Sequence, residues 1–172
     1  MNKDNKLRIN HITRILFICL GNICRSPAAE GVLRSMVEER GLADEIYIDS
    51  AGIGSWHVGE QPDRRMRKHA ARRGYDLSAL RARQFRPADF ERFHWIVVMD
   101  DENYHDVMRQ APADFPQKKY AKVVRISDFF QRFQGYDSVP DPYYGGDEGF
   151  EVALDRIEDA CGGLLSKLSE NE

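Results

Sequence analysis

The sequence predicts a single α/β domain with a central four-stranded parallel sheet flanked by helices on both faces. Short apolar segments alternate along the chain with segments of helical spacing, an order typical of parallel sheets. The chain of 172 residues has the length of one domain, and its 42% hydrophobic and 31% charged residues suit one core and a solvated surface. This composition excludes a disordered chain and a disulfide-stapled mini-protein. Residues 1–12 are expected to form a polar extension and residues 13–172 the domain.

The charge and the apolar runs predict a soluble, cytoplasmic protein. The formal net charge of −3 gives no overall attraction to nucleic acid or to an anionic membrane. The longest apolar run, residues 15–20, is far shorter than the ~20 residues of a membrane-spanning helix. The polar N-terminus contains no signal-peptide run, and three cysteines are too few for a secreted disulfide framework. We therefore expect neither a nucleic-acid partner nor a membrane partner.

The first half of the chain begins with a strand. Residues 13–18 (TRILFI) are β-branched and apolar, and the segment is short enough for a buried strand. A helix is expected over residues 28–40, because Pro27 suits its first turn and Gly41 follows its end. Residues 45–50 (EIYIDS) predict the second strand. Strand, helix and strand in this order make one right-handed crossover.

The middle of the chain repeats this alternation. A helix is expected over residues 62–73, where Pro62 suits the start and Gly74 the end. Residues 95–99 (WIVVM) form a continuous apolar run typical of a fully buried strand. Residues 101–110 then predict a helix, and residues 123–126 are the candidate fourth strand.

The last helix and the loop before it complete the domain. Residues 150–168 place apolar side chains at three- and four-residue spacing, and Cys161 among them is expected to be packed in the core. The preceding loop, residues 135–149, is rich in Pro, Gly and Tyr. In a parallel sheet the carboxyl ends of all strands share one edge, where ligands bind. Cys19 ends the first strand at this edge.

The loop after the first strand has the features of an anion site. It reads Cys19-Leu20-Gly21-Asn22-Ile23-Cys24-Arg25-Ser26-Pro27. Gly21 and Asn22 readily adopt left-handed conformations, which would curl the loop and aim successive N–H groups at one centre. The helix beginning near Ser26 adds its free N–H groups, and Arg25 adds a planar fork that suits two phosphate oxygens. The sequence therefore predicts a phosphate-binding loop, without the glycines and lysine of a nucleotide-binding loop.

Cys19 faces the same positive centre and is the candidate nucleophile. This setting stabilises a thiolate, and a thiolate aimed at a bound phosphate is placed for catalysis through a phosphocysteine intermediate. Ser26 is placed to hydrogen-bond the sulfur and to help it leave in the second step. The spacing C-x5-R alone recurs by chance, so the prediction depends on strand, curl, arginine and helix start occurring together.

The residues CLGNICRSP followed by AAE resemble the phosphate-binding signature of the low-molecular-weight protein tyrosine phosphatases. The family's second signature, an Asp-Pro-Tyr-Tyr loop near the C-terminus, is matched by residues 141–146 (DPYYGG). Further similarities lie at residues 50–52 (SAG), 56–63, 81–84 (RARQ) and 99–100 (MD). The resemblance runs from Ile15 to the last helix, and it implies the family's fold and the hydrolysis of protein phosphotyrosine.

A phosphate monoester needs its leaving oxygen protonated, so a carboxylic acid is expected near the anion loop. Asp141 is the first candidate, since Pro140 and Pro142 restrict its backbone. The resemblance implies that Asp141 acts as general acid and then activates water to hydrolyse the phosphoenzyme. Asp137 and Asp147, in the same loop, are the weaker rivals and are expected to be solvated.

Aromatic residues are expected to line a deep cleft above Cys19. The resemblance places Tyr143 and Tyr144 on one wall, with Trp56 or His57 across from them. Such a cleft admits an aryl phosphate and keeps the shorter phosphoserine away from the sulfur. The predicted substrate-binding set is Leu20, Gly21, Asn22, Ile23, Cys24, Ser26, Trp56, Tyr143 and Tyr144.

Two further features concern the support and the redox chemistry of the loop. Asn22 and Ser50 are expected to hold its shape. In the family a histidine often supports this asparagine, but the position is Leu80 here, so Ser50 and water are the expected braces. The resemblance implies that Cys24 traps oxidised Cys19 as a reversible disulfide, and a packed small side chain is the alternative.

The helix over residues 62–73 carries a basic run, whose members are Arg64, Arg65, Arg67, Lys68, Arg72 and Arg73. A solvated helix face is its expected role, and attraction of acidic phosphoprotein segments to the cleft rim is the second hypothesis. The five histidines show no paired metal spacing, and the spacing of Cys19 and Cys24 is not that of a zinc knuckle. Neither a metal nor another cofactor is implied.

Three functions remain open, and a protein-tyrosine phosphatase is the first. A thiol-dependent arsenate reductase has a similar loop but needs relay cysteines, and residues 75–95 contain none. A non-catalytic oxyanion or phosphoprotein-binding module is expected to lack Cys19, Arg25 or Asp141. The expected partner is a tyrosine-phosphorylated protein, and the loop's paired glycines, which look more bacterial than animal, make a bacterial tyrosine autokinase one candidate.

Overall fold

Parallel strands form the centre of the computed structural model, which describes residues 12–170. Four strands lie in the order β2-β1-β3-β4, and each neighbouring pair is parallel. Their bounds are β1 Thr13–Cys19, β2 Ile46–Gly52, β3 Trp95–Val98 and β4 Lys122–Arg125. The expected four-stranded parallel sheet is confirmed.

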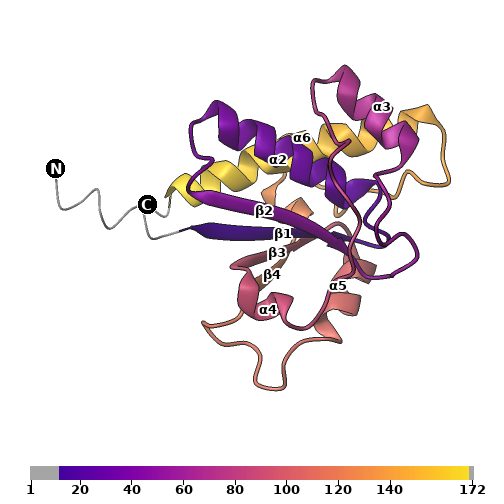
Figure 1. Ribbon diagram of the computed structural model, residues 1–172. Coiled ribbons are helices and arrows are strands. Elements are labelled where there is room, and N and C mark those ends of the chain that lie inside the picture. The colour runs from indigo at the N-terminus through magenta and orange to yellow at the C-terminus, as the bar shows by residue number, and fades with distance from the viewer. Residues whose placement is uncertain (1–11, 171–172) are drawn as a thin grey trace.

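Helices cover both faces of the sheet (Figure 1). They are α2 Arg25–Glu39, α3 Arg64–Arg72, α4 Asp89–Arg92, α5 Asp101–Met108, the short 3-10 helix η1 Ile126–Phe129 and α6 Asp147–Glu170. On one face α2 packs on β1, β2 and α6, while α3 packs against α6. The short helices α4 and α5 lie at the other face. The predicted class, with helices on both faces, is therefore the observed one.

Strand β1 divides the hydrophobic core into two layers. Its side chains alternate, so that Ile15 and Phe17 pack toward α2 and α6, whereas Leu16 and Ile18 pack toward Phe90 and its neighbours. All five are at most 1% exposed. Burial on both faces explains why this segment reads as a continuous apolar run rather than as an alternation.

Several element ends differ from their predicted positions. Strand β2 continues two residues beyond the predicted 45–50, because Gly52 still pairs with Cys19 at the end of β1. Helices α2 and α6 each begin three residues earlier than predicted, since apolar spacing marks only the buried stretch of a helix. Helix α3 begins after Asp63, whose carboxylate caps it by accepting from the N–H of Arg65 at 2.8 Å. Helices α4 and η1, four residues each, were not predicted because they are too short for a periodic signal.

Residues 1–11 fall outside the described part of the chain, and nearly all of the expected polar extension lies there. Within residues 12–170, none of the helices combines the length and the apolar character needed to span a bilayer.

Gly163 marks a very close approach of α6 to η1. A Cβ atom at this position would lie 2.0 Å from the carbonyl oxygen of Phe129, so a side chain requires one of the two helices to move. A Cβ at the preceding Gly162 would meet no atom within 4 Å. The two neighbouring glycines therefore form a matched pair for testing the packing of α6.

We predict that Gly163→Ala lowers the free energy of unfolding by about 1–3 kcal/mol, the usual cost of overpacking. Gly162→Ala should raise it by up to ~1 kcal/mol, because alanine is the better helix former. Urea denaturation of the parent and both variants measures the difference. Equal effects of the two substitutions would contradict the close contact with Phe129.

Candidate active site

The loop between β1 and α2 curls at the carboxyl edge of the sheet, as predicted. Cys19 is the last residue of β1 and Arg25 is the first of α2. Between them, Asn22 has a φ of 56°, and among the described non-glycine residues it alone has a positive φ. Asparagine tolerates this left-handed conformation better than most side chains do.

Three carbonyl groups of the loop are held from outside. The Cys19, Leu20 and Ile23 carbonyls accept from the N–H groups of Ile53, Gly54 and Asp63 at 3.0, 2.9 and 2.7 Å. Because the N–H of a trans peptide unit points away from its carbonyl, the N–H groups of these units are directed to the opposite side, toward the centre of the loop. Gly52 permits the close approach, since a Cβ there would lie 2.9 Å from the backbone nitrogen of Asn22. The result is the anion nest that the sequence predicts.

The Asn22 side chain braces the curl by three hydrogen bonds. Its Nδ2 donates to the hydroxyls of Ser26 at 2.8 Å and Ser50 at 3.0 Å, and its Oδ1 accepts from the N–H of Arg83 at 3.0 Å. Leu80, at the position where the family often has a histidine, instead packs against the hydrophobic core. The predicted brace by Ser50 is present, and the Arg83 backbone adds a second one that was not predicted.

Cys19 and Arg25 lie together at the floor of the site. Cys19 is 3% exposed, and its Sγ lies 2.9 Å from the hydroxyl of Ser26. Arg25 is equally buried, and its Nη1 donates to Asp100 Oδ2 at 2.6 Å and to the Val139 carbonyl at 3.1 Å. Burial opposes the charge of Arg25, but Cys19 and Asp100 outweigh it and raise the pKa of the guanidinium.

Asp100 is a supporting residue that sequence reasoning missed. It lies two residues after the end of β3 and caps α5 by accepting from the N–H of Asn103 at 2.8 Å, while its other oxygen holds Arg25. One feature of the sequence could have indicated this role: Asp100 comes immediately after the predicted buried strand over residues 95–99, whose end lies at the sheet edge where Cys19 was expected. One residue therefore fixes both the start of a helix and the orientation of the arginine.

Asp141 reaches the same site from the loop before α6. Its Oδ1 accepts from the N–H of Tyr143 at 3.0 Å, and its Oδ2 lies 3.6 Å from Nη2 of Arg25. The rivals Asp137 and Asp147 are exposed and do not line the pocket, and Asp147 instead contacts His69 at 3.3 Å. Of the three candidate acids, Asp141 is thus the one that lines the pocket together with Cys19 and Arg25.

A pocket of about 360 Å³ opens above Cys19. It is lined by Cys19, Leu20, Gly21, Ile23, Cys24, Arg25, Trp56, His57, Asp141, Tyr143 and Tyr144. The predicted walls are present, and both of the alternatives for the opposite wall, Trp56 and His57, take part. The His57 and Tyr143 rings are tilted against each other by 52°, with centroids 6.4 Å apart. Asn22 and Ser26, from the predicted substrate-binding set, lie behind the loop rather than in the pocket.

Comparison with known proteins identifies the family. A model described as low molecular weight phosphotyrosine protein phosphatase matches residues 14–172. The chain belongs to this family. It is 48% identical to slr0328 of Synechocystis sp. over 157 residues, which are 91% of this chain and 97% of that protein.

Solved structures agree with this membership. A protein tyrosine phosphatase from Entamoeba histolytica superposes with a TM-score of 0.85 at 41% identity, covering 92% of this chain and 98% of that chain. DARP, a Drosophila arginine phosphatase, superposes with a TM-score of 0.81 at 31% identity, covering 90% and 96%. The phosphatase therefore shares its fold with relatives that are named for two different phosphorylated side chains, tyrosine and arginine.

The cysteines of the phosphatase are all free thiols, and each is buried. Cys24 lines the pocket at 4% exposure, and burial, with the nearby charges of Asp63 and Cys19, raises the pKa of its thiol. Cys161 packs in the core between α6 and α2, as expected. Within residues 12–170, no group of three or more His, Cys, Asp or Glu side chains is arranged to hold a metal ion.

A buried carboxylate stands behind the loop. Glu30 of α2 is 4% exposed, and its Oε1 accepts from the hydroxyl of Ser50 at 2.8 Å, the same hydroxyl that receives Asn22. Burial raises the pKa of Glu30 to about 7, although the Ser50 hydrogen bond and Arg34 favour the carboxylate. Glu30 therefore titrates in the neutral range at the end of the chain of hydrogen bonds that braces the phosphatase loop.

We predict that Glu30→Gln changes the pH dependence of stability. A pKa raised above the unfolded value of about 4.3 means that folding favours the protonated acid, so the parent loses stability as the pH rises through 7. The variant cannot ionise, so its free energy of unfolding should exceed that of the parent increasingly from pH 5 to 8, by up to about 3 kcal/mol. Thermal or urea unfolding across this range measures the difference.

Glu38→Gln is the matched control, because Glu38 lies exposed on the same helix. Its stability should follow that of the parent at every pH. A Glu30→Gln variant that also runs parallel to the parent from pH 5 to 8 would show that Glu30 ionises normally.

Proposed function

We propose that this phosphatase hydrolyses phosphotyrosine in proteins, through a phosphocysteine intermediate on Cys19. The observation that carries the proposal is that three side chains from three parts of the chain line one pocket: Cys19 of β1, Arg25 of α2 and Asp141 of the loop before α6. Family membership supports the same activity. The arsenate reductase and the non-catalytic module lack such support, since residues 75–95 carry no relay cysteine and Cys19, Arg25 and Asp141 are all present.

In the first step, the Cys19 thiolate attacks the phosphorus of the bound ester. The S–P bond forms as the P–O bond to the tyrosine ring breaks, and Asp141 transfers its proton to the leaving phenolate oxygen. The loop N–H groups and Arg25 hold the three non-bridging oxygens, where charge is retained in the transition state. Nη2 of Arg25 is suited to this role, because the 3.6 Å to Asp141 is beyond a normal hydrogen bond.

In the second step, the Asp141 carboxylate takes a proton from water, and the oxygen of that water attacks the phosphorus. The S–P bond breaks, and inorganic phosphate and the Cys19 thiolate are released. The Ser26 hydroxyl, 2.9 Å from the sulfur, is placed to donate a hydrogen bond to the departing thiolate. Asp141 thus acts first as acid and then as base.

The shape of the pocket favours an aromatic ester. Cys19 is nearly buried, so a phosphorylated side chain must be long enough to reach it past the aromatic residues that line the pocket, Trp56, His57, Tyr143 and Tyr144. Phosphoserine is too short for this path. Phosphoarginine is the second candidate substrate, because the similar protein DARP is an arginine phosphatase. We also propose that the enzyme is cytoplasmic. One proposed substrate is the tyrosine-rich tail of a bacterial tyrosine autokinase, because the paired glycines Gly145 and Gly146 give the loop a form that looks more bacterial than animal.

We predict that Cys19→Ser abolishes phosphate release from a phosphotyrosine peptide under reducing conditions. Asp141→Asn should lower kcat by about 10²–10⁴-fold, and less for an aryl phosphate whose phenol is a strong acid, because that leaving group needs no proton. Asp137→Asn, in the same loop but outside the pocket, should retain the activity of the parent. Phosphoserine and phosphoarginine peptides complete the assay.

Two results would contradict the assignment. If Asp137→Asn lost activity while Asp141→Asn kept it, another carboxylate would be the acid. If phosphate were released faster from the phosphoarginine peptide than from the phosphotyrosine peptide, the enzyme would be an arginine phosphatase.

We also propose that Cys24 protects Cys19 from irreversible oxidation. Hydrogen peroxide converts the Cys19 thiolate to a sulfenic acid, and attack by Cys24 sulfur then forms the disulfide and releases water. We expect dithiothreitol to restore activity to the peroxide-treated parent and to Cys161→Ser, but not to Cys24→Ser, in which oxidation continues to the sulfinic acid. Full recovery of Cys24→Ser would show that no disulfide with Cys24 is needed.

A further inference from the structure

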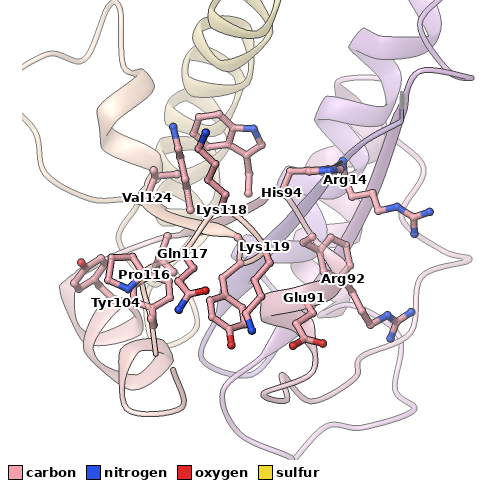
Figure 2. Close-up of a pocket in the computed structure, with 17 residues that line it drawn as sticks. Arg14, Glu91, Arg92, His94, Tyr104, Pro116, Gln117, Lys118, Lys119 and Val124 are labelled. Carbon is pink, nitrogen blue, oxygen red and sulfur yellow. Dashed lines mark hydrogen bonds between the residues drawn. The ribbon is translucent and has the colours of Figure 1, made fainter. Parts of the chain in front are cut away.

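A second, larger hollow lies at the opposite edge of the sheet. This groove, of about 1350 Å³, is formed where β1, β3 and β4 begin and is closed on another side by residues 115–120. In Figure 2, Arg14 and Arg92 lie at one side of the groove and Tyr104 at the other, with Lys118 and Lys119 between them. Strand β1 separates the groove from Cys19, which at about 3.3 Å per residue for seven residues is a distance of about 20 Å.

The groove carries a concentration of positive charge on an acidic protein. Its cationic side chains are Arg14, Arg92, Lys118, Lys119 and Lys122, and one carboxylate, Glu91, lies among them. Of these five cations, only Lys119 forms a salt bridge within the described chain, with Asp114 at 3.3 Å. The chain as a whole has a net charge of −3, so the positive charge of the groove is a local excess on this surface.

Aromatic rings and an edge strand complete the groove. Lys122 lies over the Trp95 ring at 5.5 Å and Lys119 over the Tyr120 ring at 4.8 Å, so the cations stand above apolar surface. Strand β4 is an edge of the sheet. The N–H of Lys122 donates inward to the His94 carbonyl, and because successive residues of a strand alternate in direction, Val123 directs its backbone groups outward. An extended peptide can pair with such an edge.

We propose that this groove docks an acidic, extended segment of the protein substrate, at a site separate from the phosphate pocket. The five cations supply the charge complementarity, and the edge of β4 supplies main-chain hydrogen bonds. A peptide fits these features better than a nucleic acid, which has no main-chain amides that could pair with a strand edge. The role in substrate selection rests on the proposed phosphatase activity, whereas the binding itself does not.

The distance between the two sites sets the substrate geometry. A fully extended chain needs about six residues to cover 20 Å and more to follow the protein surface, so a linker of about fifteen residues suffices. Docking the acidic segment then raises the effective concentration of the phosphotyrosine at the pocket. This lowers KM without changing the chemical step.

The first experiment measures binding alone. A fluorescein-labelled ten-residue peptide of alternating Glu and Val, without phosphotyrosine, is titrated with the protein at low and at physiological salt, and anisotropy is recorded. We expect saturable binding that weakens with salt and falls at least tenfold in the triple variant Lys118→Glu, Lys119→Glu, Lys122→Glu. The matched control reverses three charges on α3, Arg64→Glu, Arg67→Glu and Lys68→Glu, and should bind as the parent does.

The second experiment measures turnover of a phosphotyrosine peptide joined by fifteen Gly and Ser residues to the same acidic segment or to its Gln analogue. For the parent and the α3 variant, we expect the KM of the acidic form to be at least tenfold lower than that of the Gln analogue. For the groove variant, we expect the two KM values to be equal. A short phosphotyrosine peptide should be hydrolysed equally by the parent, the groove variant and the α3 variant. Equal binding and KM in the groove variant would overturn the docking proposal even with activity intact. Tighter binding of a single-stranded oligonucleotide than of the acidic peptide, lost in the groove variant, would overturn it in favour of nucleic acid.

Discussion

The left-handed conformation of Asn22 is the constraint on which the site depends. A residue at φ 56° turns the loop back on itself, and without that turn the N–H groups between Cys19 and Arg25 would not share a centre. The conformation is unfavourable for most side chains, and three hydrogen bonds to Ser26, Ser50 and Arg83 hold it in place. The same Ser26 hydroxyl meets the sulfur of Cys19, so the group that fixes the backbone also touches the nucleophile.

The parallel sheet explains why distant residues meet at this loop. Strands β1 and β3 are neighbours, so Cys19 at the end of one and Asp100 just beyond the end of the other reach the same edge. Arg25 then links three segments, since it contacts Asp100, the Val139 carbonyl and, at longer range, Asp141. The shorter contact orients the guanidinium, and the longer one leaves a nitrogen for the substrate. Asp100 thus fixes the position of the Arg25 guanidinium, while the greater distance to Asp141 keeps one of its nitrogens available for the substrate.

Much of this site was predictable because its signals are local. The apolar strand, the Gly21-Asn22 turn, Arg25 and the helix start occupy one short segment, and short-range preferences fix their geometry. The supports left weaker signals in the sequence, because their contacts are not local. Glu30, Arg83 and Asp100 act through contacts with Ser50, Asn22 and Arg25, which lie 20, 61 and 75 positions away in the sequence, and no local spacing predicts these contacts. The helix α4 was missed for the same reason: its Asp89 is buried by a contact with Arg83, and the helix is too short to show a periodic apolar pattern.

The basic run of α3 was expected to be a solvated helix face, but one of its residues contacts the loop that carries Asp141. A solvated helix face describes Arg64 and Lys68, which are exposed. Arg65, however, donates to the Tyr143 carbonyl at 2.9 Å, and His69 contacts Glu151 at 2.6 Å near the start of α6.

These contacts restrain the chain on one side of Asp141. On its other side, the N–H of the fully buried Val139 bonds the Met99 carbonyl at 2.9 Å. The loop that carries the acid is therefore anchored at both ends although Tyr144 at its tip is 93% exposed. An acid that must serve in two successive proton transfers benefits from this arrangement, because its position is held by Met99 after β3 and by Arg65 of α3 rather than by the substrate.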